Sequence, residues 1–175
     1  MKTRNLTHIA IMAGILCILG PLTIVIGPIP LSMVSFAVYL SGAILGCKRG
    51  AAAVGIYLLI GLAGMPVFAG FSAGLQKLMG VTGGYLIGYL PCALITGLGV
   101  PAANDRRDRL LPLRRAVGTA ALYSVGTAWF MVQTGNPIGA ALAICVLPFL
   151  PGDILKIAAA SVIAPSVRRA ALRAR

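Results

Sequence analysis

The chain has 175 residues, of which 59% are hydrophobic and only 10% are charged, and its mean hydropathy is +0.96. A soluble domain of this length cannot bury so much apolar surface, so the composition indicates a single integral membrane domain over residues 1–175. The net charge of +12 does not indicate nucleic-acid binding, because the basic residues are confined to short segments between long apolar stretches. Membrane lipid is therefore the predicted surrounding of this chain.

The basic residues gather in four clusters, and only two lysines lie outside them. By the positive-inside rule all four clusters are predicted to face the cytoplasm. The apolar run after the first basic cluster ends without a small-residue cleavage site, so we interpret it as a first membrane span rather than a signal peptide. The clusters are Lys2/Arg4, Lys48/Arg49, Arg106 to Arg115, and Arg168 to Arg175.

Six apolar stretches are long enough, with some local thinning of the bilayer, to be membrane helices. The sequence thus predicts an all-α membrane protein with six transmembrane helices and with both termini in the cytoplasm. A tight outer turn is expected at Gly27–Pro30, and a solvated cytoplasmic loop at Asn104–Arg109. The expected spans are roughly Thr7–Ile26, Leu31–Cys47, Gly50–Gly64, Thr82–Pro101, Arg115–Gln133 and a last helix that begins near Pro151.

Between the third and fourth spans the segment Gly61–Gly84 contains seven glycines. So much glycine disfavours a regular helix, and irregular backbone survives at membrane depth only when it is buried in protein or lines a cavity. We interpret the segment as a structured outer loop that folds over the bundle and helps to cover a site, with a flexible loop as the alternative. Lys77 within it is expected to be a solvated charge.

The closing apolar run, 138–164, should be divided by Pro148 and Pro151 into a short outer helix and the final span. It contains Asp153, the only acidic residue outside the cytoplasmic loop. A buried aspartate in a membrane helix costs about 2.5–3.5 kcal/mol, and Lys156, three residues on, lies on the same helical face. The pair is either a structural ion pair or a polar site for a ligand or proton, and the adjacent helix break favours a site.

The chain offers little for catalysis. It has no Walker A, G-x-S-x-G or H-E-x-x-H motif, contains no glutamate, and its only histidine is His8. Its four cysteines show no metal-type spacing. We therefore expect no enzyme, no catalytic residues, no metal and no cofactor. A small, mostly apolar ligand with one polar group suits the Asp153–Lys156 pair.

Three separated motifs resemble the signatures of the BioY family, namely Gly64–Gly70, Gly80–Gly88 and Pro148–Lys156, and Gly27–Pro30 and Gly46–Gly50 are similar to that family's pattern. BioY proteins are the biotin-binding S components of energy-coupling factor (ECF) transporters. The resemblance implies six membrane helices in a bacterial or archaeal cytoplasmic membrane and biotin bound near the outer face. It also implies two kinds of partner, an ECF transmembrane coupling subunit and separate ABC ATPases, of which the ATPases hydrolyse ATP.

The resemblance further implies that Asp153 and Lys156 contact biotin. Our hypothesis is that Asp153 accepts a ureido N–H, while Lys156 pairs either with the valerate or with the ureido carbonyl, and both options stay open. Aromatic rings would pack the apolar part of the ligand, and backbone amides would be exposed at the start of the fourth span. These further candidates are Tyr85, Phe68, Phe71, Gly83 and Gly84.

Ala10 and Gly14 in the first span form a small-xxx-small pair that allows close helix packing. The pair could meet another helix of this chain, and it is also our candidate surface for docking the ECF transmembrane subunit. Two other functions remain as alternatives: a solitary proton-coupled transporter of a small vitamin-like substrate that uses Asp153, and a membrane scaffold in which the Asp153–Lys156 pair is structural. Homo-oligomerisation and the dedicated or shared nature of the ATPases stay open.

Overall fold

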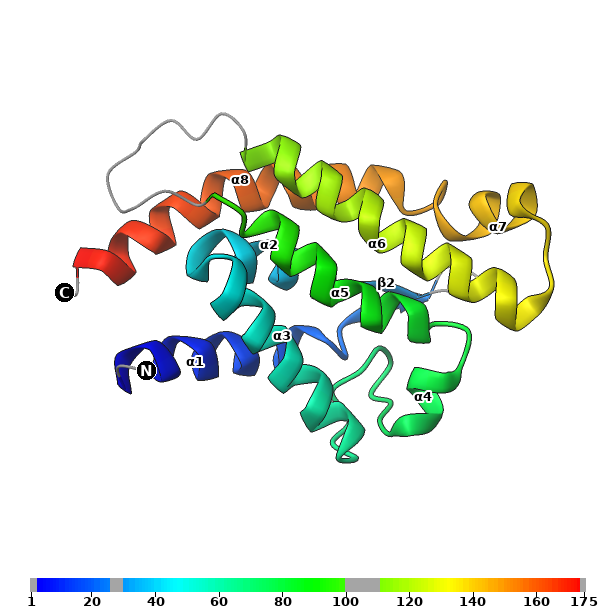
Figure 1. Ribbon diagram of the computed structural model, residues 1–175, viewed down its shortest axis with the longest axis horizontal. Helices are drawn as coiled ribbons and strands as arrows, with labels where there is room; N and C mark the ends of the chain where they lie inside the picture. Colours follow the sequence, from blue (N-terminus) through cyan, green and yellow to red (C-terminus); the bar gives the residue numbers. More distant parts are fainter. Residues whose placement is uncertain (1–2, 26–29, 100–110, 174–175) are drawn as a thin grey trace.

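The computed structural model describes residues 3–25, 30–99 and 111–173 (Figure 1). Within these residues the chain forms eight helices and one short antiparallel hairpin. The predominantly helical fold is as predicted, whereas the hairpin was not predicted. In chain order the elements are α1 (Thr3–Leu19), β1 (Thr23–Val25), β2 (Pro30–Ser32), α2 (Val34–Leu45), α3 (Cys47–Leu62), α4 (Leu75–Met79), α5 (Gly83–Thr96), α6 (Leu111–Thr134), α7 (Ile138–Cys145) and α8 (Leu150–Arg173).

Helix α2 lies at the centre of the bundle, where it contacts α1, α3, α5 and α8, while α6 packs along α5 on the other side (Figure 1). The core between them is apolar with a few paired hydroxyls. Tyr39 of α2 is fully buried, and its hydroxyl lies 2.7 Å from the Thr119 hydroxyl of α6. A buried hydroxyl of this kind needs a partner, and the pair therefore connects the two sides of the bundle.

The first helix ends earlier than predicted, at Leu19, and the chain then enters the β1–β2 hairpin, in which Thr23 is opposite Ser32. Pro21 has no N–H to continue a helix, and the β-branched residues after it favour an extended backbone. The predicted span to Ile26 is thus wrong beyond Leu19. The predicted turn Gly27–Pro30 and the loop Asn104–Arg109 lie mostly or wholly outside the described residues.

The remaining predicted spans correspond to α2, α3, α5, α6 and α8, with ends that differ by several residues. The closing run is divided as predicted, since α7 ends at Cys145 and α8 begins at Leu150. Among the described helices, only α8 is both long and apolar enough to cross a membrane by length and composition, over Leu150–Arg168. Helices α1, α2 and α5 are apolar but shorter.

The glycine-rich segment between α3 and α5 is irregular except for α4 and is held to the bundle by hydrogen bonds. The Gly74 N–H donates to the Gly61 carbonyl at 2.8 Å, which closes the segment on itself. The Tyr57 hydroxyl of α3 donates to the Val67 carbonyl at 3.2 Å, and the Trp129 indole of α6 donates to the Gly80 carbonyl at 3.0 Å. The segment is therefore tied to helices on two sides of the bundle.

Helices α5 and α6 approach closely because glycines replace side chains at their contact. A Cβ at Gly126 of α6 would lie 2.4 Å from the Tyr85 ring, and one at Gly84 of α5 would lie 2.2 Å from the Trp129 Cβ. No real Cβ atom tolerates such distances, so these positions fix the spacing of the two helices. Gly126 in particular leaves the space that the Tyr85 ring occupies.

We expect Gly126→Ala to destabilise the fold by about 1–3 kcal/mol, the usual cost of overpacking, because the new methyl group displaces the Tyr85 ring. Gly55→Ala is the matched control, since a Cβ at Gly55 of α3 has no neighbour within 4 Å and alanine is the better helix former. The measurement is the thermal midpoint of the detergent-solubilised protein. Equal midpoints for the two variants would contradict this account of the α5–α6 contact.

Candidate functional site

The site is built around an ion pair in the first turns of α8. The Lys156 ammonium lies 3.1 Å from Asp153 Oδ1, and only 5% of Asp153 and 8% of Lys156 is exposed. Helix α8 begins just after Pro148, which places both side chains on its inward face near its N-terminal end. The partial positive charge of that end stabilises the aspartate.

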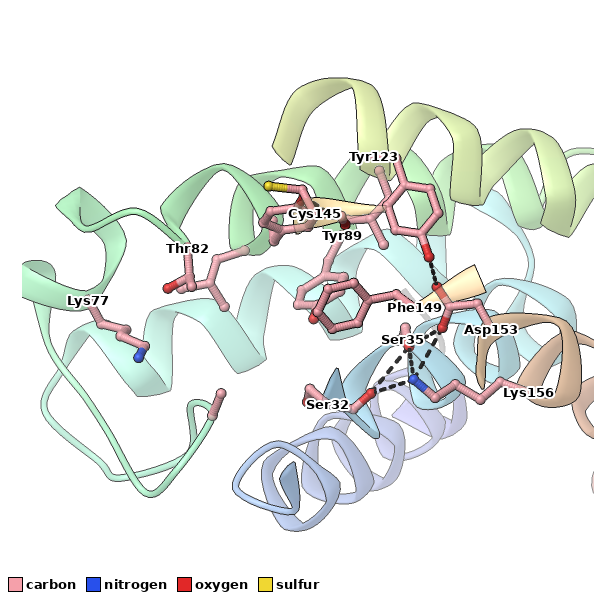
Figure 2. Close-up of a pocket in the computed structure, with 14 residues that line it drawn as sticks. Ser32, Ser35, Lys77, Thr82, Tyr89, Tyr123, Cys145, Phe149, Asp153 and Lys156 are labelled. Carbon is pink, nitrogen blue, oxygen red and sulfur yellow. Dashed lines mark hydrogen bonds and ion pairs between the residues drawn. The ribbon is translucent and has the colours of Figure 1, made fainter. Parts of the chain in front are cut away.

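The ammonium is held by the end of β2 and the first turn of α2. Lys156 Nζ donates to the Ser32 carbonyl at 2.8 Å and to the Ser35 hydroxyl at 3.0 Å, in addition to the aspartate (Figure 2). A lysine ammonium has three donors, and each of them has a protein acceptor here. A buried charge with all its hydrogen bonds made is tolerated where an unpaired one is not.

The second carboxylate oxygen of Asp153 is held from α6. The Tyr123 hydroxyl donates to Asp153 Oδ2 at 2.6 Å, a short distance typical of a hydrogen bond to an ionised oxygen. The Ser35 hydroxyl lies 3.4 Å from Oδ1. A backbone carbonyl of β2 and side chains of α2, α6 and α8 therefore meet at one carboxylate–ammonium pair, which is positioned before any ligand arrives.

This pair forms one end of a cavity of about 60 Å³, which is room for several water molecules. Its wall is mostly aromatic and aliphatic: Tyr85, Leu86 and Tyr89 come from α5, and Phe149 comes from the turn before α8. The remaining lining residues are Ser32, Ser35, Ala69, Lys77, Thr82, Leu122, Tyr123 and Cys145, together with the pair itself (Figure 2).

The two tyrosines of α5 differ in what their hydroxyls do. The Tyr85 hydroxyl is directed at protein groups, the Cys145 carbonyl at 3.4 Å and the Thr127 hydroxyl at 3.5 Å. The Tyr89 hydroxyl makes no hydrogen bond within residues 3–25, 30–99 and 111–173, although the residue is only 8% exposed. Tyr85 therefore presents an apolar ring to the cavity, whereas Tyr89 brings a hydroxyl that a ligand can use.

Several residues that the sequence marked as ligand contacts do not line the cavity. Phe68 is fully buried in the core, where its ring meets the Tyr57 ring edge-on with centroids 5.6 Å apart, and Phe71 is 70% exposed. Gly83 is buried against Leu78 and Gly84 against Trp129, so closely that a Cβ at either position would overlap its neighbour. In the structure these four residues have packing or surface positions, and a contact with a ligand stays a prediction for them.

Other residues of the site were missed. Ser32, Ser35, Tyr89 and Tyr123 lie on elements far apart in the sequence, and no local motif identifies them. The one signal was energetic, since a buried pair requires additional hydrogen-bond partners. Lys77, expected to be a solvated charge, is half-buried and lines the cavity.

Comparison with known proteins gives a consistent result along nearly the whole chain. The BioY family model matches residues 1–173. The "Probable biotin transporter BioY" of Pyrococcus horikoshii is 35% identical over 94% of this chain and 96% of that protein, and the "Biotin transporter BioY" of Thermotoga maritima is 32% identical over 95% and 96%. The corresponding protein of Rhodobacter capsulatus is 35% identical over 98% of both chains.

Among solved structures, the fold matches the crystal structure of the S component for biotin from an ECF-type ABC transporter, with a TM-score of 0.88 and 29% identity. That match covers 96% of this chain and 92% of the other. Because the family model spans almost the entire sequence and full-length relatives are more than 30% identical, this chain belongs to the BioY family.

Proposed function

We propose that this protein binds biotin and is the substrate-specific subunit through which an ECF-type transporter takes biotin up into the cell. The observation that carries the proposal is the buried Asp153–Lys156 pair, with every donor of the ammonium used, at the end of an aromatic cavity in a chain of the BioY family. Such a subunit is not an enzyme, and partner ABC ATPases supply the energy. The site itself takes no metal or cofactor.

The chemistry of biotin fits the two parts of this cavity. Its ureido ring carries two N–H donors and a carbonyl, and its thiophane ring is apolar. The Asp153 carboxylate accepts a ureido N–H, for which it retains one free lone pair, on Oδ2. The Tyr89 hydroxyl is available to donate to the ureido carbonyl, and the rings of Tyr85 and Phe149 cover the apolar part. Because the Asp153–Lys156 pair is buried, where the effective dielectric constant is low, these polar contacts are stronger than in water.

The membrane arrangement that we propose has six spans and both termini in the cytoplasm. In support, the start of α1, the α2–α3 turn, the start of α6 and the end of α8 all lie at one end of the molecule, at the left of Figure 1. These are the places of the four basic clusters, so the positive-inside rule gives one consistent orientation. Helices α1, α2, α3, α5, α6 and α8 are then the spans, and the glycine-rich segment with α4 lies on the outer side.

Exposed apolar side chains support contact with lipid around the bundle. Val132 of α6 is 85% exposed and Leu155 of α8 is 72% exposed. A soluble protein rarely leaves so many large apolar residues in contact with water. In a membrane such positions are favourable, because lipid tails are as apolar as the side chains.

Asp153→Asn should weaken biotin binding about 10- to 100-fold, since a hydrogen bond to a charged group is worth roughly 1.5–3 kcal/mol and the amide leaves the Lys156 charge unbalanced. The measurement is calorimetric titration of biotin into the purified, detergent-solubilised chain. Ser124→Ala is the control, because Ser124 is exposed on α6 next to Tyr123 but hydrogen-bonds only its own helix. Unchanged affinity in a folded Asp153→Asn protein contradicts the assignment.

The double variant Asp153→Leu/Lys156→Met separates the binding role from a scaffold role. Replacing a buried ion pair with apolar residues is often neutral for stability, so we expect the variant to fold with a similar thermal midpoint but to lose biotin binding. Binding that survives in this variant would show that the pair is purely structural. The readouts are thermal midpoint and calorimetric affinity of the same preparation.

We propose that Ala10 and Gly14 of α1 form part of the docking surface for the ECF transmembrane subunit. Both are exposed, and a Cβ at Gly14 meets no atom of this chain within 4 Å. The small pair therefore does not pack inside the monomer. It leaves a shallow strip on α1 at which a second helix can approach closely.

Ala10→Trp should abolish co-purification with the co-expressed transmembrane subunit and leave biotin affinity unchanged, because the bulky ring blocks close helix approach far from the cavity. Ala120→Trp, at an exposed position of α6 on the opposite side of the bundle, is the matched control and should retain the partner. If both variants co-purify equally well, α1 is not the docking surface. Uptake that needs no co-expressed ATPase would instead support a solitary transporter.

A further inference from the structure

Lys77 is the charged group of the cavity that the proposed biotin contacts leave unused. It lies on α4, in the glycine-rich segment, and lines the cavity at the end away from the Asp153–Lys156 pair (Figure 2). Its side chain is half-buried, and within the described parts of the chain its ammonium has no hydrogen bond or ion pair. A positive charge directed at a ligand cavity without an anion is a binding group for an anion.

The two lysines of the cavity differ in whether their ammonium donors are free for a ligand. All three donors of Lys156 are taken by Ser32, Ser35 and Asp153. A ligand carboxylate at that end would have to displace one of these acceptors and would lie beside the negative charge of Asp153. Like charges at short range in a site of low dielectric repel strongly. The end of the cavity at Asp153 therefore suits a neutral N–H donor rather than an acid.

The charge balance of the cavity favours the same orientation of the ligand, with its neutral group at Asp153. Asp153 and Lys156 neutralise each other, and Asp153 is the only acidic residue within the described parts of the chain. Lys77 thus leaves the empty cavity with one uncompensated positive charge. A ligand with a neutral polar ring at one end and a single carboxylate at the other makes the occupied site neutral.

From these contacts we infer that Lys77 is a specificity-determining residue, which binds the carboxylate of the ligand while the neutral ring of the ligand is bound at Asp153. The inference rests on the proposed function and deepens it, because it orients biotin with the ureido ring at α8 and the valerate at α4. It also assigns to Lys77 the selection of the free acid over neutral derivatives in which the carboxyl group is an amide or ester.

The test is calorimetric titration of biotin and of biotinamide, its neutral amide, into the full detergent-solubilised chain and into Lys77→Met. The unmodified protein should prefer biotin. In Lys77→Met, biotin should bind about tenfold more weakly, the loss expected for a partly exposed charge-assisted contact, while biotinamide binds as before. Lys77→Arg should keep the preference for the acid, because arginine retains the charge.

Two controls separate this role from others. Lys48→Met removes the same charge at an exposed position in the first turn of α3, and Gln76→Met changes the exposed neighbour of Lys77 on α4. Neither should alter the ratio of the two affinities. The ratio is the deciding quantity, because a merely structural role of Lys77 in positioning α4 would change both affinities together.

The inference is overturned if Lys77→Met weakens both ligands equally or weakens neither. It is also overturned if Lys156→Met, and not Lys77→Met, removes the preference for the acid, since the carboxylate would then lie at α8. If the unmodified, folded protein binds neither ligand, the proposed function fails and the inference fails with it. If the protein binds biotin but the ratio is insensitive to Lys77, only the inference fails.

Discussion

A carboxylate and an ammonium buried among apolar helices are stable only if their hydrogen bonds are made, and this requirement determines how α2, α6 and α8 meet. Lys156 is bound by Ser32 and Ser35, and Asp153 by Tyr123. Removing one partner of a buried pair typically costs about 3–5 kcal/mol. The hydrogen bonds that stabilise the buried ion pair thus also fix the position of the carboxylate. A ligand meets a preorganised acceptor and does not have to order it.

The aromatic wall of the cavity depends on a second constraint, the close approach of α5 and α6. Because Gly126 carries no side chain, the Tyr85 ring fits between the helices with its hydroxyl directed at the Cys145 carbonyl of α7. The sequence suggested that Gly84 exposes a backbone amide to the ligand. In the structure Gly84 instead packs closely against Trp129. The glycines around the site shape it indirectly, by setting the distance between helices.

What the sequence could predict was what is encoded locally. Asp153 and Lys156 share one helical face because they are three residues apart. The free-energy cost of burying two charged groups in a membrane indicated a site even before any partner of theirs was known. Their partner Tyr123 is 30 residues away and Ser35 is 118 residues away, so only the folded chain could identify them. Phe68 shows the converse: an aromatic residue in a glycine-rich segment can pack equally well on a ligand or on Tyr57, and composition does not distinguish the two. The end of α1 was missed because the apolar run continues on both sides of Gly20 and Pro21, although these two residues interrupt the helix.

The cavity is closed by two parts of the chain that differ in how firmly they are held. At α8 the polar network joins three helices through buried side chains. At α4 the segment is joined to α6 by the Trp129–Gly80 bond and by an exposed bond from Gln133 to the Met79 carbonyl. Regions with few buried contacts open at a lower free-energy cost than the core. A transport subunit must both retain and release its substrate, and this asymmetry allows α4 to move while the carboxylate stays in place. A ligand held at both ends would bridge the firm part and the weaker part and thereby stabilise the position of α4.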